Sequence, residues 1–239
     1  MSQPLFREDA YRVSAPGRVV AHTPEGGVVL DQCLFYATGG GQPGDTGTLA
    51  WEGGEIAIAT CVKGEGDALA LVPAIPGALP QVGSEVVQRL DWAQRLGHMR
   101  VHTALHLLSV VIALPVSGGA ISADKGRLDF DMPEAPGDKA ALEQALNALV
   151  SRDLAVSESW ISDDDLRANP GLVKTMSVMP PLGSGRVRLV RIGDDADQVD
   201  LQPCGGTHVA RTGEIGALRL GRIEKKGRLN RRVYLHLDS

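Results

Sequence analysis

Residues 92–114 of the chain read WAQRLGHMRVHTALHLLSVVIAL, and Pro115 follows directly. Apolar side chains recur in this stretch at spacings of three to five, as on one face of an amphipathic helix; they are Leu96, Val101, Leu105, Leu108 and Ile112. Because proline cannot continue a helix, we expect the helix to run from Trp92 to Leu114. The sequence patterns on its two sides differ, so this helix marks where the chain divides.

The ninety residues before the helix have the pattern of short strands separated by turns. Glycine (29 residues) and proline (14) are abundant in the chain, which favours many turns and a large β content. We expect strands at residues 18–21, 27–31, 48–51, 55–62 and 68–72. Since no helical period appears among them, the sequence predicts a small antiparallel β-barrel domain over residues 1–90.

The chain after the helix alternates between strand and helix patterns. Asp138 is the expected N-cap of a helix that runs to about Leu154, and Ser162 with Asp165 forms the expected capping box of a short helix. We expect strands at residues 127–132, 155–160, 186–192, 217–224 and 231–237, the last two joined as a hairpin across residues 226–230. Helices segregated from an antiparallel sheet predict the α+β class, with a two-layer α/β domain over residues 91–239.

Composition excludes several classes of protein. Hydrophobic residues make up 43% and charged residues 22% of the 239 residues, a globular balance rather than that of a disordered chain. No apolar run reaches the roughly 18–20 residues that span a bilayer, so we expect no membrane partner. The three cysteines cannot all pair, and the N-terminus has no secretory signal. We therefore expect reduced thiols and a cytoplasmic protein.

Charge is unevenly distributed along the chain. The formal net charge is −5, so this is not a generally basic nucleic-acid coat protein, and aromatics at 4% are too few for a large stacking platform. From Arg211 to the C-terminus, however, eight Lys and Arg residues stand against three acidic residues. This segment either docks a polyanion or forms a solvated pair of strands, and its charge alone favours neither.

Two pairs of residues have the spacing of metal ligands. His102 and His106 are four residues apart in the expected helix, so both imidazoles project from one face and can share a metal at roughly 2.0–2.1 Å. Cys204 and His208 enclose Gly205–Gly206–Thr207, a run flexible enough to turn thiolate and imidazole toward one point. Thiolate and imidazole together favour one zinc ion over magnesium or calcium. The alternative is a buried thiol beside a hydrogen-bonded histidine.

The kind of zinc site is constrained by the neighbouring residues. A helical zinc peptidase has glutamate directly after its first histidine as the general base, and here that position holds Thr103. Four protein ligands normally close a structural site, so a hydrolytic zinc here requires a loose ligand or expansion to five-coordination. His98 lies one turn before His102, and we expect it to touch RNA or substrate, or else to be exposed to solvent.

At these residues the chain resembles the AlaX family, the free-standing alanyl-tRNA editing proteins, and the editing domain of alanyl-tRNA synthetases. The similar stretches are RVHTALHLL at 100–108, CGGTHV at 204–209, TGEIG at 212–216 and KGRLNRRVY at 226–234. A glycine-rich segment, FYATGGGQPGDTG at 35–47, is similar to that of the medium-length type. The resemblance therefore covers nearly the whole chain.

The resemblance implies a β-barrel-like first domain and an editing domain whose zinc activates hydrolysis of Ser-tRNA(Ala) or Gly-tRNA(Ala) made in error by the synthetase. Since no class II catalytic core precedes the barrel, editing in trans is expected. An aminoacyl ester is activated, so a metal that polarises its carbonyl, or lowers the pKa of bound water toward ~7, suffices. Two alternatives stay open. One is a zinc-stabilised tRNA-binding module without turnover; the other is a deacylase of another mischarged tRNA, because threonyl editing domains share the metal pattern.

Rejection of alanine requires a site that rewards the serine hydroxyl. The candidate catalytic residues for this selection carry hydroxyls: Thr103, Ser122 and Thr38, each of which can instead serve a cap or a turn. Some synthetase editing domains have threonine directly before the second histidine of the helix pair. Here that position is Leu105, which departs from the pattern.

Two segments are expected to contact the RNA. The glycine-rich segment lets RNA backbone or the aminoacyl end approach closely, or else turns a hairpin; its candidate residues are Gly39, Gly40, Gly41 and Gln42. No Gly-Lys-Ser/Thr follows it, so we expect no nucleotide cofactor. We assign the acceptor stem of tRNA(Ala) to the basic tail, with Lys225, Lys226, Arg228, Arg231 and Arg232.

Overall fold

The computed structural model describes residues 2–173 and 185–238, and the chain divides into two compact units, residues 1–97 and 98–239. Each unit has its own sheets and its own core, and each is described by itself below. The helix α1 (Trp92–Val111) begins in the first unit, and its residues from His98 onward belong to the second.

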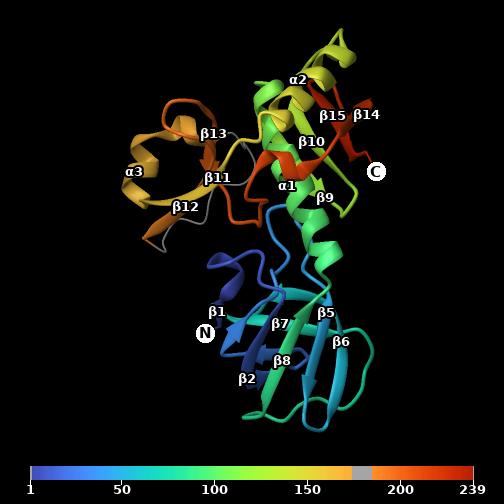
Figure 1. Ribbon diagram of the computed structural model, residues 1–239, viewed down its shortest axis with the longest axis vertical. Coiled ribbons are helices and arrows are strands. Elements are labelled where there is room, and N and C mark those ends of the chain that lie inside the picture. The colour runs from blue at the N-terminus through green and yellow to red at the C-terminus, as the bar shows by residue number, and fades with distance from the viewer. Residues whose placement is uncertain (1, 174–184, 239) are drawn as a thin grey trace. The chain divides into compact units, whose positions relative to one another are not determined.

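The first unit is a closed six-stranded barrel (Figure 1). Its strands are β2 (Ser14–His22), β3 (Val28–Leu30), β5 (Gly47–Trp51), β6 (Gly54–Lys63), β7 (Leu69–Pro73) and β8 (Glu85–Leu90). They close in the order β2-β3-β7-β6-β5-β8, and every neighbouring pair is antiparallel. The prediction of a small antiparallel barrel is therefore confirmed. A short parallel pair, β1 (Gln3–Pro4) with β4 (Gln32–Cys33), and the 3₁₀ turn η1 (Leu5–Arg7) accompany it.

The barrel core follows from the alternation of side chains along the strands. Its fully buried members come from most of the barrel strands; they include Val19, Leu30, Leu49, Ile58, Leu71 and Val86. Gln88 on β8 also points inward and is fully buried. Its amide oxygen accepts the backbone N–H of Leu34 at 2.8 Å, and its amide nitrogen donates to the carbonyls of Pro16 and Gln32. A polar side chain can lie in this core because all of its polar atoms are paired.

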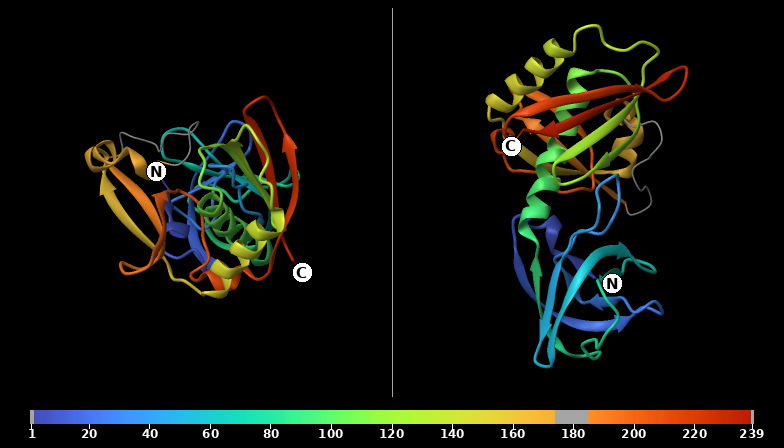
Figure 2. Two further views of the ribbon diagram at one scale, coloured as in Figure 1. Left: turned by 90° about the horizontal axis from the view of Figure 1, so that it is seen from above. Right: turned by 90° about the vertical axis from the view of Figure 1, so that its right-hand side faces the viewer.

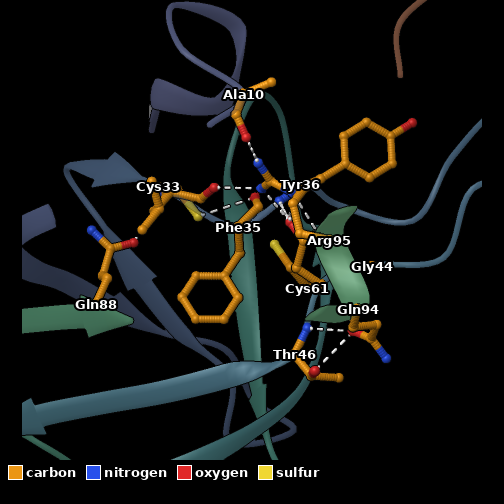
Figure 3. A network of polar contacts seen from close by, with 12 residues as sticks. Ala10, Cys33, Phe35, Tyr36, Gly44, Thr46, Cys61, Gln88, Gln94 and Arg95 are labelled. Carbon is orange, nitrogen blue, oxygen red and sulfur yellow. Dashed lines mark hydrogen bonds and ion pairs between the residues drawn. The ribbon is translucent and has the colours of Figure 1, made fainter. Parts of the chain in front are cut away.

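A buried ion pair fastens the glycine-rich segment to the first turn of α1. Arg95, which is 0% exposed, donates from Nε to both carboxylate oxygens of Asp45 at 3.1 and 3.0 Å. Its other nitrogens donate to the carbonyls of Ala10 and Leu34, so the guanidinium joins three separate segments (Figure 3). Asp45 also accepts the backbone N–H of Tyr36 at 2.6 Å. Both charges are therefore compensated inside the protein.

The second unit combines two antiparallel sheets with helices. Its elements after α1 are β9 (Val116–Ile121), β10 (Lys125–Asp131), α2 (Lys139–Ser151), β11 (Val156–Ser162), α3 (Asp163–Ala168), η2 (Pro170–Leu172), β12 (Arg186–Gly193), β13 (Gln198–Pro203), η3 (Thr212–Ile215), β14 (Leu218–Lys225) and β15 (Asn230–Leu237). One sheet has the order β14-β15-β10-β9, and the other has the order β11-β12-β13 (Figure 2). The α+β class and the β14–β15 hairpin are confirmed.

Close packing joins α1 to the four-stranded sheet. A Cβ at Gly126 of β10 would lie 2.7 Å from Val101 and 3.0 Å from Leu105, so only glycine lets the helix approach the strand here. Helix α2 contacts the edge strand β14, where the Asn147 amide exchanges two hydrogen bonds with the backbone of Leu218. On α1, the predicted apolar residues Val101, Leu105 and Leu108 are buried.

Helix starts agree with the sequence better than helix ends do. The Asp138 carboxylate accepts the N–H of Ala141, and the capping box of Ser162 and Asp165 is present, as expected. The expected ends were wrong. Helix α1 stops at Val111 rather than Leu114, and α2 stops at Ser151, beyond which Asp153 has a positive φ of 49° that no helix continues.

The strands β8, β9 and β13, and the two-residue strands β1 and β4, were not expected from the sequence. Every expected strand lies within four residues of the observed bounds. Within residues 2–173 and 185–238, none of the helices combines the length and apolar composition that a bilayer crossing requires.

Candidate metal centre

Four side chains of the second unit converge as a candidate metal centre. They are His102 and His106 from α1, and Cys204 and His208 from the segment that follows β13. Each offers one ligand atom, and these atoms all lie within 4.8 Å of one another. The three histidines are 6–8% exposed. The four residues that the sequence singles out by spacing are therefore together in space.

The distances between the donor atoms suit a tetrahedral ion. The Cys204 Sγ lies 3.4 Å from Nε2 of His102 and 3.2 Å from Nε2 of His208. For ligands at about 2.0–2.1 Å (nitrogen) and 2.3 Å (sulfur) from zinc, neighbouring tetrahedral donors stand about 3.3–3.6 Å apart. A donor set of one thiolate and three imidazoles suits zinc. The residues present thus fit a zinc ion in both chemistry and spacing.

Arg188 on β12 shapes the segment that carries Cys204 and His208. Its Nη1 donates to the carbonyl of Cys204 at 2.8 Å and to the carbonyl of Gly206 at 2.9 Å. The side chain is buried and forms an ion pair with Glu158 on the neighbouring strand β11. One guanidinium thereby fixes the turn between two ligands. Arg188 could not be recognised from the sequence, because no spacing rule connects it to the Cys-Gly-Gly-Thr-His run.

Thr103 orients His208. The Thr103 hydroxyl donates to the carbonyl of Met99 at 2.9 Å, so its lone pairs remain for other groups. It accepts the backbone N–H of Val209 at 3.3 Å and lies 3.1 Å from Nδ1 of His208. Nδ1 must therefore carry the proton and donate it to Thr103. This tautomer leaves the lone pair on Nε2, the nitrogen that faces Cys204.

Asp200 orients His106 in the same way. The carboxylate, 2% exposed, lies 2.9 Å from Nδ1 of His106 and accepts the Gln202 amide at 2.7 Å. A carboxylate behind a ligating histidine fixes the ring and its tautomer. Burial by itself lowers the pKa of His106, but the hydrogen bonds with Asp200 and Cys204 raise it to about 9. Metal binding at Nε2 therefore displaces a proton from this ring.

The other donors are electrostatically prepared for a cation. Burial, together with the charge of His102, lowers the pKa of His208 to about 3, so this imidazole is neutral at neutral pH. Burial opposes ionisation of Cys204, but the neighbouring His102 and His208 outweigh it and hold the pKa of this thiol well below its usual value. A thiolate and a neutral imidazole are the forms that ligate metals.

The three hydroxyl candidates lie in different surroundings. Thr103 is fully buried and bonds to His208, as described. Ser122 is exposed, in the turn that joins β9 to β10, where its backbone N–H donates to the carbonyl of Lys125. Thr38 belongs to the first unit, where its hydroxyl accepts the N–H of Gly44 at 2.9 Å.

Two other residues of α1 lie beside these histidines, His98 one turn before the pair and Leu105 within it. The alternative that His98 is exposed to solvent was wrong, because its side chain is only 2% exposed. Leu105, directly before His106, is buried against Gly126 of β10.

The glycine-rich segment forms a tight turn. Gly39 and Gln42 form an isolated antiparallel bridge with hydrogen bonds in both directions. Between them Gly40 and Gly41 have positive φ values of 59° and 83° and are exposed, while Gln42 is 1% exposed. The turn therefore presents glycine backbone to solvent, and its geometry explains why two glycines occupy its tip.

The basic residues of the C-terminal hairpin fall into two groups. Arg231 is buried and donates to the carbonyls of Gly227, Asn230 and Pro133, and Arg232 forms a two-pronged ion pair with Asp129 at 2.7 and 2.9 Å. Lys226 pairs with Glu224 at 2.8 Å. Lys225 and Arg228 are exposed. The charges of Arg231 and Arg232 are thus largely occupied within the fold.

A barrel followed by an α+β unit with one thiolate and three imidazoles defines a class of protein related to class II tRNA synthetases. Two family models match accordingly: "tRNA synthetases class II (A)" at residues 13–94 and "Threonyl and Alanyl tRNA synthetase second additional domain" at residues 187–234. The chain belongs to the AlaX-M family of alanyl-tRNA editing proteins. It is 31% identical over 247 residues to the alanyl-tRNA editing protein AlaX-M of Methanosarcina acetivorans, with 99% of both chains covered.

Longer relatives contain a segment that is similar to this chain. The chain is 35% identical over 230 residues to the alanine–tRNA ligase of Pyrobaculum calidifontis, covering 92% of this chain. It spans only 25% of that ligase's length, whereas it spans 99% of the AlaX-M protein of Methanosarcina barkeri at 31% identity. The family therefore occurs both as a free-standing chain and as a segment of a synthetase.

Proposed function

We propose that this protein is a zinc-dependent hydrolase that acts in trans on mischarged tRNA(Ala), releasing serine and, in addition, glycine. The observation that carries the proposal is the convergence of His102, His106, Cys204 and His208 in a chain of the AlaX-M family. Its relatives in that family are alanyl-tRNA editing proteins. Such substrates arise during translation, which fits the expected cytoplasmic location.

The four residues would hold the metal, and two others keep them in the required form. A zinc ion in this set would supply a Lewis acid for an ester carbonyl. Thr103 and Asp200 hold protons on the Nδ1 atoms of His208 and His106, which points the Nε2 lone pairs into the cluster. Arg188 donates a hydrogen bond to the backbone carbonyl of Cys204 and so fixes the backbone at this ligand. Preorganised donors of this kind need no rearrangement when substrate arrives.

We assign the deacylase chemistry to residues 91–239 and tRNA contacts to the glycine-rich segment and the basic hairpin. Gly40 and Gly41 expose backbone that an RNA chain can approach closely, and Lys225 and Arg228 expose positive charge. For the choice of serine over alanine we keep the three hydroxyls as candidates, with Thr103 acting through His208 rather than by direct contact. A group that pairs with the serine hydroxyl would be left unpaired by alanine.

The test is the rate of deacylation of purified Ser-tRNA(Ala), Gly-tRNA(Ala) and Ala-tRNA(Ala) by the full chain. The expected result is release of serine and of glycine, with alanine retained. Single variants Thr103→Val, Ser122→Ala and Thr38→Ala then show which hydroxyl affects the ratio of serine to alanine release.

The two alternatives appear as distinct outcomes of that test. Four protein ligands also describe a structural zinc site; a tRNA-binding module would bind mischarged tRNA and leave every ester intact. The second family model also covers threonyl synthetases. Hydrolysis of Ser-tRNA(Thr) with Ser-tRNA(Ala) spared would therefore assign the activity to another tRNA.

A further inference from the structure

A basic hollow lies on the outer face of the four-stranded sheet. Its volume is about 540 Å³, and it is lined by residues of β10, α2, β14 and β15: Lys125, Lys139, Arg219, Leu220, Gly221, Arg222, Tyr234 and His236. Five of these eight are basic, and none is acidic. None of the eight is among Lys225, Lys226, Arg228, Arg231 and Arg232, the residues expected to contact the acceptor stem, although Arg219 and Arg222 belong to the same basic segment from Arg211 onward.

Strand register places three of the basic side chains in one row. His236 on β15 pairs with Lys125 on β10 and with Arg219 on β14, so the row crosses three neighbouring strands. His236 stands between Lys125 and Arg219, and no acidic side chain stands in this row. The row therefore leaves two cations without a partner across the strands, which an external anion can supply.

A second row on the same sheet shows the usual arrangement. Arg232 on β15 pairs with Asp129 on β10 and with Glu224 on β14. The guanidinium bonds to Asp129 at 2.7 and 2.9 Å, so positive charge is compensated between neighbours. The two rows lie four residues apart along β15 and differ in charge. The row of Arg232 alternates acidic and basic side chains, whereas the row of His236 contains only basic side chains.

The hollow depends on the absence of a side chain at Gly221. The register of β14 shifts between Leu220 and Ile223, and Gly221 lies in this bulge. A Cβ at Gly221 would lie 2.7 Å from Nε2 of His236 and 2.9 Å from Cβ of Tyr234, so any side chain there would fill the floor of the hollow. The guanidinium of Arg222 stacks 4.9 Å from the ring of Tyr234 and forms its wall.

The charge in the hollow is only partly compensated. Within the described ranges, no ion pair joins Lys125 or Lys139 to a carboxylate, and the pair of Arg219 with Asp238 is long, at 3.9 Å. Arg222 pairs with Glu224 at 2.6 Å. Burial, with the charges of Arg219 and Lys125, lowers the pKa of His236, which reports a positive potential there. Asp124 is the nearby acid that opposes this effect.

We propose that this hollow binds phosphates of the tRNA backbone, with Lys125, Lys139 and Arg219 as the cationic contacts. The inference rests on the proposed function for its choice of polyanion. Phosphate contacts position a nucleic acid without reading its sequence. A volume within the range of ligand pockets, roughly 300–1,000 Å³, exceeds one phosphate and accommodates a stretch of sugar-phosphate backbone. The hollow thereby fixes where the tRNA lies on the second unit.

The test is the affinity of the full chain for uncharged tRNA(Ala) transcript, measured by fluorescence anisotropy over a series of salt concentrations. The variant is Lys125→Gln with Arg219→Gln, which keeps side-chain bulk and removes two charges. Its control is Arg152→Gln with Arg167→Gln, which removes two exposed, ion-paired charges from the same unit. Uncharged tRNA separates binding at the hollow from the chemistry of deacylation.

The proposal expects the hollow variant to raise the Kd about 10- to 30-fold near ~0.15 M salt and to reduce the salt slope by about two. Its urea midpoint should stay close to that of the wild type, because both substituted side chains are exposed. A Kd and slope equal to those of the control variant would overturn the proposal. So would a weaker affinity with an unchanged slope, which would point to altered folding.

The failure of this proposal and that of the proposed function are distinguishable. If the wild type deacylates Ser-tRNA(Ala) while the hollow variant binds tRNA normally, the hollow proposal fails and the function stands. If the wild type leaves the ester intact while the variant loses affinity and slope, the function fails and the phosphate site stands.

Discussion

Helix α1 contributes to two buried polar centres that are completed in opposite ways. In the first unit Arg95 meets Asp45, and the guanidinium also bonds to two backbone carbonyls. In the second unit His102 and His106 meet Cys204 and His208, a set of four donors that all offer lone pairs to one point. The first centre is thus an ion pair between a carboxylate and a guanidinium, whereas the second is a set of potential metal ligands.

The difference between these centres shows what each unit requires in order to be stable. In the barrel, the charges of Arg95 and Asp45 compensate each other, so this centre needs no bound ion. The four donors are satisfied together only by a cation, and binding of a structural zinc contributes directly to folding free energy. The account therefore expects metal dependence in the second unit and none in the first. The predictions below test this contrast, from the largest effect to the smallest.

Removal of the thiolate should have the largest effect. Cys204→Ala is expected to lower the rate of serine release by about 10³-fold or more, because a bound metal is worth several kcal/mol to the transition state. Zinc content, measured by mass spectrometry of the native protein, should fall in parallel. The matched control is Cys61→Ala in the barrel core, which removes a thiol from the first unit. Loss of zinc or activity in the control would contradict the contrast.

Breaking the ion pair should cost nearly as much, but in stability rather than activity. Arg95→Met leaves Asp45 buried without its partner and is expected to destabilise the first unit by about 3–5 kcal/mol. Urea unfolding followed by hydrogen exchange reports each unit separately. Adding Asp45→Leu should recover part of the loss, since a buried pair can be replaced by apolar residues. A chelator that lowers the stability of the barrel would contradict its independence from metal.

The Asp200 carboxylate, which bonds to His106, should affect the affinity for zinc. Asp200→Asn is expected to weaken zinc binding about 10- to 100-fold, measured by competition with a chelating dye. Asp197→Asn, at an exposed carboxylate paired with Arg152, is the matched control and should bind zinc normally. Equal zinc affinities in the two variants would show that Asp200 does not orient the ligand.

The smallest effect is expected at Thr103. Thr103→Val removes the acceptor for His208 and should weaken zinc binding by up to about 10-fold, whereas Thr103→Ser, which keeps the hydroxyl, should bind as the wild type does. Visible spectra of the cobalt-substituted proteins give a second readout of ligand geometry. A serine variant that behaves like the valine variant would assign the effect to packing.

The sequence revealed the ligands because spacing on a helix and across a short loop is local information. It also indicated the barrel, whose strands carry regular apolar patterns. It missed β13 because its buried residues are Asp200 and Gln202, which are polar in order to support His106. It missed β8 for a similar reason: Gln88 points into the core and breaks the apolar alternation. In β9 two consecutive glycines, Gly118 and Gly119, hide the strand.

The supporting residues of the site were beyond sequence patterns for a different physical reason. Asp200 is 94 positions from His106, and Arg188 is 16 positions from Cys204, so only the tertiary fold brings them together. Thr103 was identified as a hydroxyl beside the metal, but its partner His208 lies 105 positions away. Spacing can therefore find a pair of ligands on one element, whereas their orienting partners depend on how elements pack.

The most direct test of the central claim is a titration of zinc into the metal-stripped full chain while serine release from Ser-tRNA(Ala) is followed, with Ala-tRNA(Ala) in parallel. The account predicts that the rate rises linearly and reaches a plateau at one zinc per chain, with alanine retained throughout. Full activity before any zinc is added, or a folded, zinc-loaded protein that leaves the serine ester intact, would contradict it.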